Sequence, residues 1–238
     1  MLKLPDPARV PVAAIAWCHA SRIVPARFRA ADCFERILDP GEDSLGDTLA
    51  RLSELTAPSG AGDLRLMDPS QVLFGAGAGW INASFAVPRA ARFSTARYGA
   101  FYVAEELGTC VAEVRYHLER DYRREGITEA MDLEFRALAI TVHGPLKDLR
   151  GKPRTRAPWA GVCDPGSCGA AQAFAATLRE AGSRGVVYDS VRQEGGVCAA
   201  VFDPNLLRGC RHDTYLSFRW DGQYVSRVFE KRIVALRG

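Results

Sequence analysis

The chain has 238 residues, of which 47% are hydrophobic and 25% are charged, and its net charge at pH 7 is +3. This composition is typical of a folded globular protein and excludes a chain that is disordered throughout. No apolar run reaches the roughly 18 residues of a membrane-spanning helix, and the small net charge does not predict a nucleic-acid-binding face. We therefore expect no membrane association and no direct contact with nucleic acid.

Seven cysteines are scattered along the chain without a regular spacing. An odd number of cysteines without a disulfide framework predicts free thiols in a reducing compartment, so we expect a cytoplasmic protein. Cys163 and Cys168 are separated by four residues, but neither a second pair nor suitably spaced histidines accompany them. We therefore expect no metal site.

The N-terminal third predicts short strands and one helix. Residues 7–28 contain β-like pieces that are interrupted by prolines. Four leucines then recur at spacings of three and four, which predicts a helix near residues 44–56 that ends at Pro58. The glycine-rich residues 74–80 predict a loop, and they lack the Lys-Ser/Thr pair of a phosphate-binding loop.

The rest of the chain alternates between predicted strands and helices. Strands are predicted at 100–104, 137–142, 185–188, 197–202 and 215–220, and helices at 106–123 and 170–182. The glycines of SVRQEGG are expected to close a hairpin between the strands at 185–188 and 197–202. No linker indicates a domain boundary, so we predict one compact α+β domain in which mixed β-sheets are flanked by helices.

Glu113 is the first candidate for chemistry. On the predicted helix it lies beside the apolar stripe rather than opposite it, and His117 follows one turn later on the same edge. A carboxylate at a seam between a helix and a sheet can face a cleft. The alternative is a solvated glutamate that pairs with Arg115 or Arg120.

Ser190 and two N-terminal arginines are further candidates. Ser190 follows a predicted strand and opens a loop, where the alternative is a turn serine whose hydroxyl caps its own backbone. Arg22 and Arg27 flank a β-like segment. An arginine on a buried strand needs an anion or a carboxylate, whereas the default for both residues is the surface.

Four segments together resemble the RES-domain family, the toxins of bacterial toxin–antitoxin pairs, whose name refers to an Arg, a Glu and a Ser. They are RIVPARF (22–28), RFSTARYGAFYVAEELGTCVAEVRYH (92–117), GVVYDSVRQEGGVCAAVF (185–202) and RWDGQYVSRVFEKR (219–232). The resemblance is to the longer, protein-modifying subgroup. It implies a single RES-type domain over residues 1–238, with an N-terminal extension over 1–75 and a catalytic core over 76–238.

The resemblance implies a fold similar to that of ADP-ribosyltransferase catalytic domains. It also implies an enzyme that consumes NAD as substrate and transfers ADP-ribose to a protein, to water or to phosphate. The expected partner is a cognate Xre-like antitoxin that covers the active site, and any DNA contact is expected to occur through it. The alternative is a non-catalytic module that binds a nucleotide or only its antitoxin.

The resemblance also assigns site residues. The family Glu and Ser match Glu113 and Ser190, and the N-terminal Arg matches Arg22, with Arg27 as a nearby alternative. Arg92 and Tyr102 match the arginine of the turn and the tyrosine of the strand that follows it.

Each of these residues has an expected role in cleaving the bond between nicotinamide and ribose. Glu113 would stabilise an oxocarbenium-like transition state, and Ser190 would orient it. Arg22 and Arg92 would hold the pyrophosphate, because an arginine fork binds phosphate oxygens bidentately. Tyr102 would stack on the nicotinamide ring.

Overall fold

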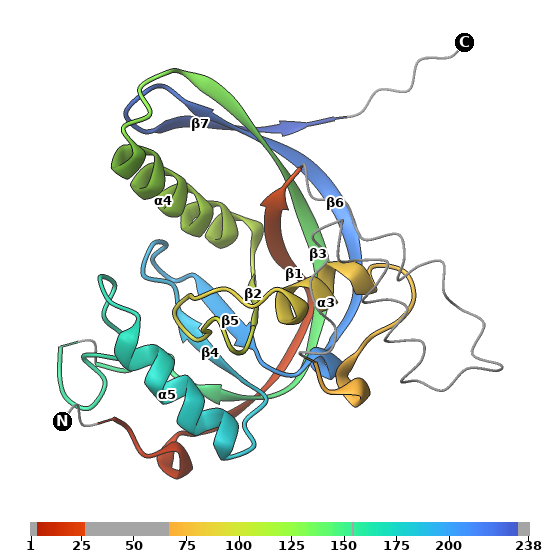
Figure 1. Ribbon diagram of the computed structural model, residues 1–238, viewed down its shortest axis with the longest axis vertical. Coiled ribbons are helices and arrows are strands. Elements are labelled where there is room, and N and C mark those ends of the chain that lie inside the picture. Colours follow the sequence, from red (N-terminus) through yellow and green to blue (C-terminus); the bar gives the residue numbers. More distant parts are fainter. Residues whose placement is uncertain (1–3, 27–66, 154, 233–238) are drawn as a thin grey trace.

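The computed structural model describes residues 4–26, 67–153 and 155–232, and its ribbon is shown in Figure 1. The predicted helix near 44–56 and Arg27 lie outside the described residues. The strands are β1 (Val12–Pro25), β2 (Phe101–Ala104), β3 (Met131–Asp148), β4 (Gly185–Asp189), β5 (Val197–Val201), β6 (Leu207–Trp220) and β7 (Val225–Lys231). The helices are α3 (Ala78–Ala86), α4 (Leu107–Glu125) and α5 (Gly169–Glu180), with short 3-10 helices at Pro7–Arg9, Pro69–Gln71 and Pro204–Leu206.

The strands of the described residues form one mixed sheet in the order β1-β2-β5-β4-β3-β6-β7, with an additional pairing between β1 and β3. β3 pairs with β1 along one edge, from Pro25↔Phe135 to Val12↔Lys147, and with β6 along the other edge. The pairing with β6 ends at Val142↔Leu207, and β4 pairs in parallel with β3 from Lys147 onward. Because β1 also pairs with β2, the pairings β1-β2-β5-β4-β3-β1 close on themselves. The predicted mixed α+β architecture is confirmed.

The N-terminal strand differs from the sequence prediction of several short pieces. It is one strand of 14 residues, Val12–Pro25. Its single proline is at the end, where a missing backbone N–H interrupts no ladder. This continuous strand is possible because each of its residues from Val12 to Trp17 and from Ala20 to Pro25 pairs with β3.

One α-helix and one strand were not predicted. α3 begins inside the segment expected to be a loop, and the end of the chain forms β7. Gly77, directly before α3, has a φ of +78°, and a Cβ at this position would overlap the carbonyl oxygen of Cys210. The glycine therefore lets the helix start in direct contact with β6, an arrangement that glycine content alone does not predict.

The other predicted elements that fall within the described residues are confirmed, although two strands are longer than expected. The strands at 137–142 and 215–220 are parts of β3 and β6. The hairpin is β4–β5, paired from Gly185↔Val201 to Asp189↔Val197. α4 and α5 match the two predicted helices, and α5 is followed by Gly182 with a φ of +74°.

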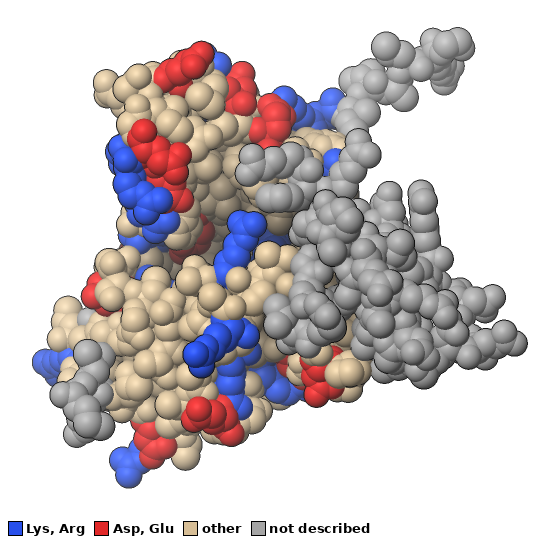
Figure 2. Space-filling model, in the orientation of Figure 1, with Lys and Arg blue, Asp and Glu red and all other residues tan. Residues whose placement is uncertain are grey.

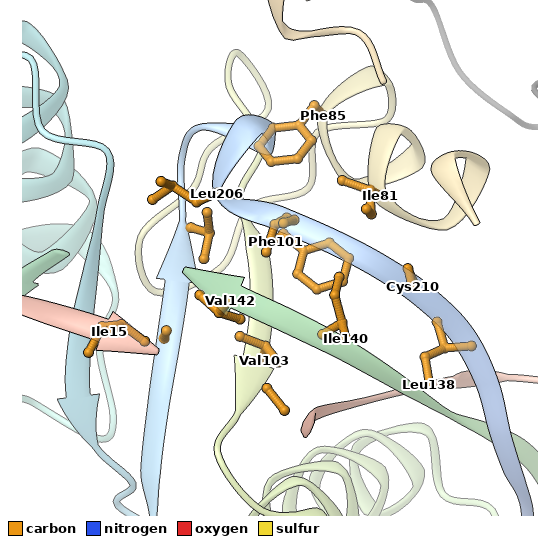
Figure 3. Close-up of a cluster of buried hydrophobic side chains, with 14 of the residues drawn as sticks. Ile15, Ile81, Phe85, Phe101, Val103, Leu138, Ile140, Val142, Leu206 and Cys210 are labelled. Atoms are coloured by element: carbon orange, nitrogen blue, oxygen red, sulfur yellow. The ribbon is translucent and has the colours of Figure 1, made fainter. Parts of the chain in front are cut away.

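Each helix covers a separate apolar cluster of the bent sheet. Ile81 and Phe85 of α3 pack over Phe101 and Ile140, as Figure 3 shows. α5 covers a second cluster that includes residues of β4 and β5, and the apolar stripe of α4 packs against a third on β3 and β6. Among the described residues, none of the helices combines the length and apolar character needed to cross a bilayer.

Candidate active site

A cavity of about 510 Å³ lies between α4, β2, the turn at residues 89–93 and the loops that follow β3 and β4. Its volume falls in the range of small-molecule binding pockets. Figure 2 shows the surface indented between α4 and the part of the molecule that contains α5. Four of the predicted site residues line this one cavity: Arg22, Arg92, Tyr102 and Glu113.

Ser190 joins the same group through a hydrogen bond. Its hydroxyl donates to Oε1 of Glu113 at 2.6 Å. Oγ of Ser190 in turn accepts hydrogen bonds from the backbone N–H groups of Arg192 and Gln193, each at 3.0 Å. The serine is therefore a turn-capping residue and also holds the carboxylate. The turn-capping contacts and the hydrogen bond to Glu113 occur together, because a hydroxyl can donate one hydrogen bond while it accepts two.

Close packing of the hairpin loop against α4 brings Ser190 to Glu113. The N–H of Ser190 donates to the carbonyl of Gly196 at 2.8 Å, which closes the loop. A Cβ at Gly196 would lie 2.6 Å from Oγ1 of the buried Thr109, one turn before Glu113 on α4. Glycine at position 196 thus permits the loop to touch the helix.

The solvated alternative for Glu113 does not describe the structure. Arg115 instead donates to Glu119 at 2.9 Å, and Arg120 pairs with Asp121 at 2.8 Å. Neither arginine forms an ion pair with Glu113, whose side chain is half-buried and faces the cavity.

Arg22 of β1 brings a positive charge to the cavity. Its Nη1 donates to the carbonyl of Tyr102 at 2.9 Å, and its guanidinium carbon lies 4.4 Å from the ring centroid of Phe101. Its Nε is buried and has no hydrogen-bond partner among the described residues. The described residues also place no carboxylate within ion-pair distance of the Arg22 guanidinium. Burial lowers the pKa of Arg22 below its usual value. A buried guanidinium is stabilised by a charged or hydrogen-bonding partner, so an anion in the cavity would be a favourable one.

Arg92 and Tyr102 also hold the walls of the cavity in place. Nη1 of Arg92 donates to the carbonyls of Asp164 at 2.7 Å and Val162 at 3.4 Å, so part of this guanidinium is already occupied. The Tyr102 hydroxyl accepts a hydrogen bond from the N–H of Phe93 at 2.8 Å. Burial raises the pKa of Tyr102, so the phenol stays protonated at neutral pH.

The lining is strongly cationic, which sequence analysis did not predict. Within the described part of the chain, the cavity is lined by six cationic side chains and by two carboxylates, those of Glu113 and Asp189. The cationic residues are Arg22, Arg89, Arg92, Arg120, Lys152 and Arg192. Asp189 accepts a hydrogen bond from the N–H of Gly151 at 2.7 Å. Lys152 and Arg192 belong to loops, where no periodic pattern marks them as parts of a site.

Tyr188 and His117 also line the cavity. Tyr188 lies two residues before Ser190, so strand alternation could have placed both side chains on one face. Its ring centroid is 5.1 Å from that of Phe93, and burial raises its pKa well above the usual value. Shielding of the imidazole from solvent, aided by the Arg120 guanidinium, lowers the pKa of His117.

Thiols line the inner part of the cavity. Cys110 of α4 and Cys198 of β5 are both buried. Burial raises the pKa of Cys110 to about 12, and it raises that of Cys198 as well. These thiols are therefore neutral at physiological pH and contribute apolar surface rather than charge. The described residues contain no group of three or more side chains arranged to hold a metal ion.

A comparison with protein-family models assigns the chain to a family. The family model described as "RES domain" matches residues 72–221, which is more than half of the chain. A search of curated proteins finds no match. Among solved structures, the chain is similar to one in the crystal structure of the M. tuberculosis MbcT–MbcA toxin–antitoxin complex. The sequence identity is 15%, the match covers 84% of this chain and 86% of that chain, and the TM-score is 0.41. The chain belongs to the RES domain family.

Proposed function

We propose that this protein is a toxin that cleaves the bond between nicotinamide and ribose in NAD. The observation that carries the proposal is the pairing of Ser190 with Glu113, at 2.6 Å, inside a cavity whose other charged lining groups are mostly cationic. NAD contains a ribose, which a carboxylate can contact, and a pyrophosphate, which arginines can bind. An oriented carboxylate beside several cations suits this combination.

The chemistry needs one carboxylate. As the carbon–nitrogen bond breaks, its electron pair leaves with nicotinamide, and positive charge develops on the ribose. Glu113 would stabilise this charge, as carboxylates do in glycoside cleavage. The pyridinium leaves as neutral nicotinamide without protonation, so no second acid is required. Ser190 would act on Glu113 rather than on NAD, because its proton is donated to the carboxylate.

The remaining lining groups would bind the dinucleotide. Arg22, whose buried Nε has no hydrogen-bond partner among the described residues, is the strongest candidate for the pyrophosphate. Arg92 would contribute the guanidinium nitrogens that the loop carbonyls leave open. The ring of Tyr102 and that of Tyr188 would offer flat faces for nicotinamide. Arg27, which lies outside the described residues, is the alternative to Arg22 as the family arginine.

A free enzyme of this kind would deplete the NAD of its own cell, so we propose an Xre-like antitoxin as partner that covers the cavity. The acceptor of ADP-ribose would be a protein, water or phosphate. We further propose that the toxin acts in the cytoplasm, because its odd number of cysteines suits a reducing compartment.

The test is to incubate the purified protein with NAD and to measure nicotinamide by chromatography and bound NAD by equilibrium dialysis. We expect catalytic release of nicotinamide. Retention of NAD without release would identify a binding module and would overturn the proposed activity.

A further inference from the structure

A second hollow, of about 470 Å³, lies outside the first, between α4 and β7. We call it the outer groove. Val111 and Ala112 of α4 and Val225 of β7 give it an apolar lining. Gly108, near the start of α4, is exposed to it, and a Cβ at this position would meet no atom within 4 Å. The outer groove therefore has room for a peptide backbone beside the helix.

The outer groove and the inner cavity share a wall. Tyr116 and Arg192 line both of them. The guanidinium carbon of Arg192 is 3.2 Å from the ring centroid of Tyr116, and its Nη2 donates to the carbonyl of Pro165 at 3.3 Å. One layer of side chains, held by a cation–π contact and one hydrogen bond, thus separates the two spaces. A side chain in the groove could reach the cavity by displacing Arg192.

β7 presents a strand edge to the groove. It is the last strand of the sheet and pairs with β6. The N–H of Val225 donates to Oε1 of Glu119 on α4 at 3.0 Å, so the edge of β7 opposite to β6 faces α4. An exposed strand edge binds an extended peptide through main-chain hydrogen bonds. The groove is consequently suited to an extended segment.

The charges of the groove favour an acidic segment. Among the described residues, one carboxylate lines the groove, that of Glu119, and it is already bound by Arg115 and Arg123, at 2.9 and 3.1 Å. Arg192 and Arg227 have no carboxylate within ion-pair distance among the described residues. Two cations beside an apolar floor complement a strand that alternates acidic and apolar side chains.

We propose that the outer groove binds an extended, acidic segment of the protein that accepts ADP-ribose. This inference rests on the proposed function. The acceptor side chain would pass the wall made by Tyr116 and Arg192 and attack the ribose. The ribose carbon–nitrogen bond breaks, and its electron pair leaves with nicotinamide. A bond forms between the same carbon and a side-chain oxygen of the acceptor, and the acceptor proton goes to solvent.

The test uses the full chain and a fluorescent peptide of about ten residues in which Glu and Val alternate around a central Ser. Binding is followed by fluorescence anisotropy, and transfer by the NAD-dependent mass increase of the peptide. We expect saturable binding, an ADP-ribose adduct and weaker binding of the counterpart that has Lys in place of Glu. Arg227→Glu should weaken binding at least about tenfold. Arg208→Glu, on an exposed part of β6, is the charge-matched control and should not.

A second variant fills the groove with a side chain that the fold can accommodate. Gly108→Leu adds a side chain to open space in α4, and Gly108→Ala controls for the gain in helix propensity. We expect Gly108→Leu to abolish the adduct while nicotinamide release from NAD alone is unchanged. If the peptide does not bind, or if all variants label it equally while NAD is cleaved, the groove proposal is wrong. If no variant releases nicotinamide, the proposed function itself has failed.

Discussion

The Ser190 hydroxyl donates a hydrogen bond of 2.6 Å to Oε1 of Glu113, although the two residues are 77 positions apart in the chain. One belongs to the loop after β4 and the other to the middle of α4. A short hydrogen bond from a buried donor restricts the rotation of the Glu113 side chain.

Glu113→Gln tests the charge of the carboxylate. The amide has nearly the same shape, and its oxygen can still accept the Ser190 proton. Loss of the negative charge should reduce nicotinamide release by at least about a hundredfold, the usual scale for a lost electrostatic stabiliser. The thermal midpoint should stay within a few degrees of the parent. A variant that cleaves NAD at the parent rate would remove Glu113 from the mechanism.

Ser190→Ala tests the positioning role. The substitution removes the donor to Glu113 and leaves the N–H groups of Arg192 and Gln193 without their acceptor. We expect a loss of about 1–3 kcal/mol in the free energy of unfolding. We also expect kcat to fall more than KM rises, because binding of NAD uses other groups. Ser190→Thr, which retains the hydroxyl, should recover most of the turnover. If Ser190→Thr is as impaired as Ser190→Ala, the hydroxyl is not the relevant group.

Gly196→Ala tests the contact between the loop and α4. The added Cβ would lie 2.6 Å from Oγ1 and 2.8 Å from Cγ2 of Thr109, so the loop must move away from the helix and carry Ser190 with it. Nicotinamide release should fall. Thr109→Ala removes both of the atoms in the way, so the double variant should recover activity relative to Gly196→Ala. This comparison is a double-mutant cycle, and additive effects of the two substitutions would contradict the contact.

Arg22→Lys tests the anion site. A lysine can replace the positive charge but not the planar guanidinium. The guanidinium donates one hydrogen bond to the carbonyl of Tyr102 and keeps further N–H groups for the cavity. The affinity for NAD should fall at least about tenfold. Isothermal titration calorimetry in the Glu113→Gln background measures binding without cleavage. Arg97→Lys, at an exposed position outside the cavity lining, is the matched control, and equal affinities of the two variants would exclude Arg22 as a ligand.

Alkaline pH should destabilise the fold through its buried thiols. Burial raises the pKa of Cys110 from 9.0 to about 12 and does the same to Cys210. Below about pH 9 both states keep these protons, and the stabilisation is complete. Between about pH 9 and 12 the unfolded chain releases protons that the native protein retains. Each thiol then lowers the free energy of unfolding by about 1.4 kcal/mol per pH unit.

Urea unfolding at about pH 8 and 10 measures this loss. The Cys110→Ala variant will be less stable at both values because the substitution leaves a cavity. The loss in the free energy of unfolding between the two pH values should nevertheless be smaller in this variant than in the parent. An unchanged difference would mean that Cys110 does not take part in the alkaline loss.

Local patterns in the sequence were sufficient for the elements that have a clear period or a clear turn. The leucines and valines of α4 recur on one face, and the two glycines between β4 and β5 mark a hairpin, so both were predicted. α3 was not predicted, because Gly77 is used for close contact with β6 rather than for a loop, and a glycine looks the same in both uses.

The sequence by itself determined the residue types of the site, the strand or helix that carries most of them, and the apolar face that each helix buries. Only the tertiary structure decided that Ser190 reaches Glu113 and that Arg22 reaches the carbonyl of Tyr102. It also decided that cations from separate loops surround them. The physical reason is the separation along the chain over which each effect acts. Periodicity and turn chemistry act over a few neighbouring residues, whereas these contacts depend on strand pairings that close β1, β2, β5, β4 and β3 on themselves.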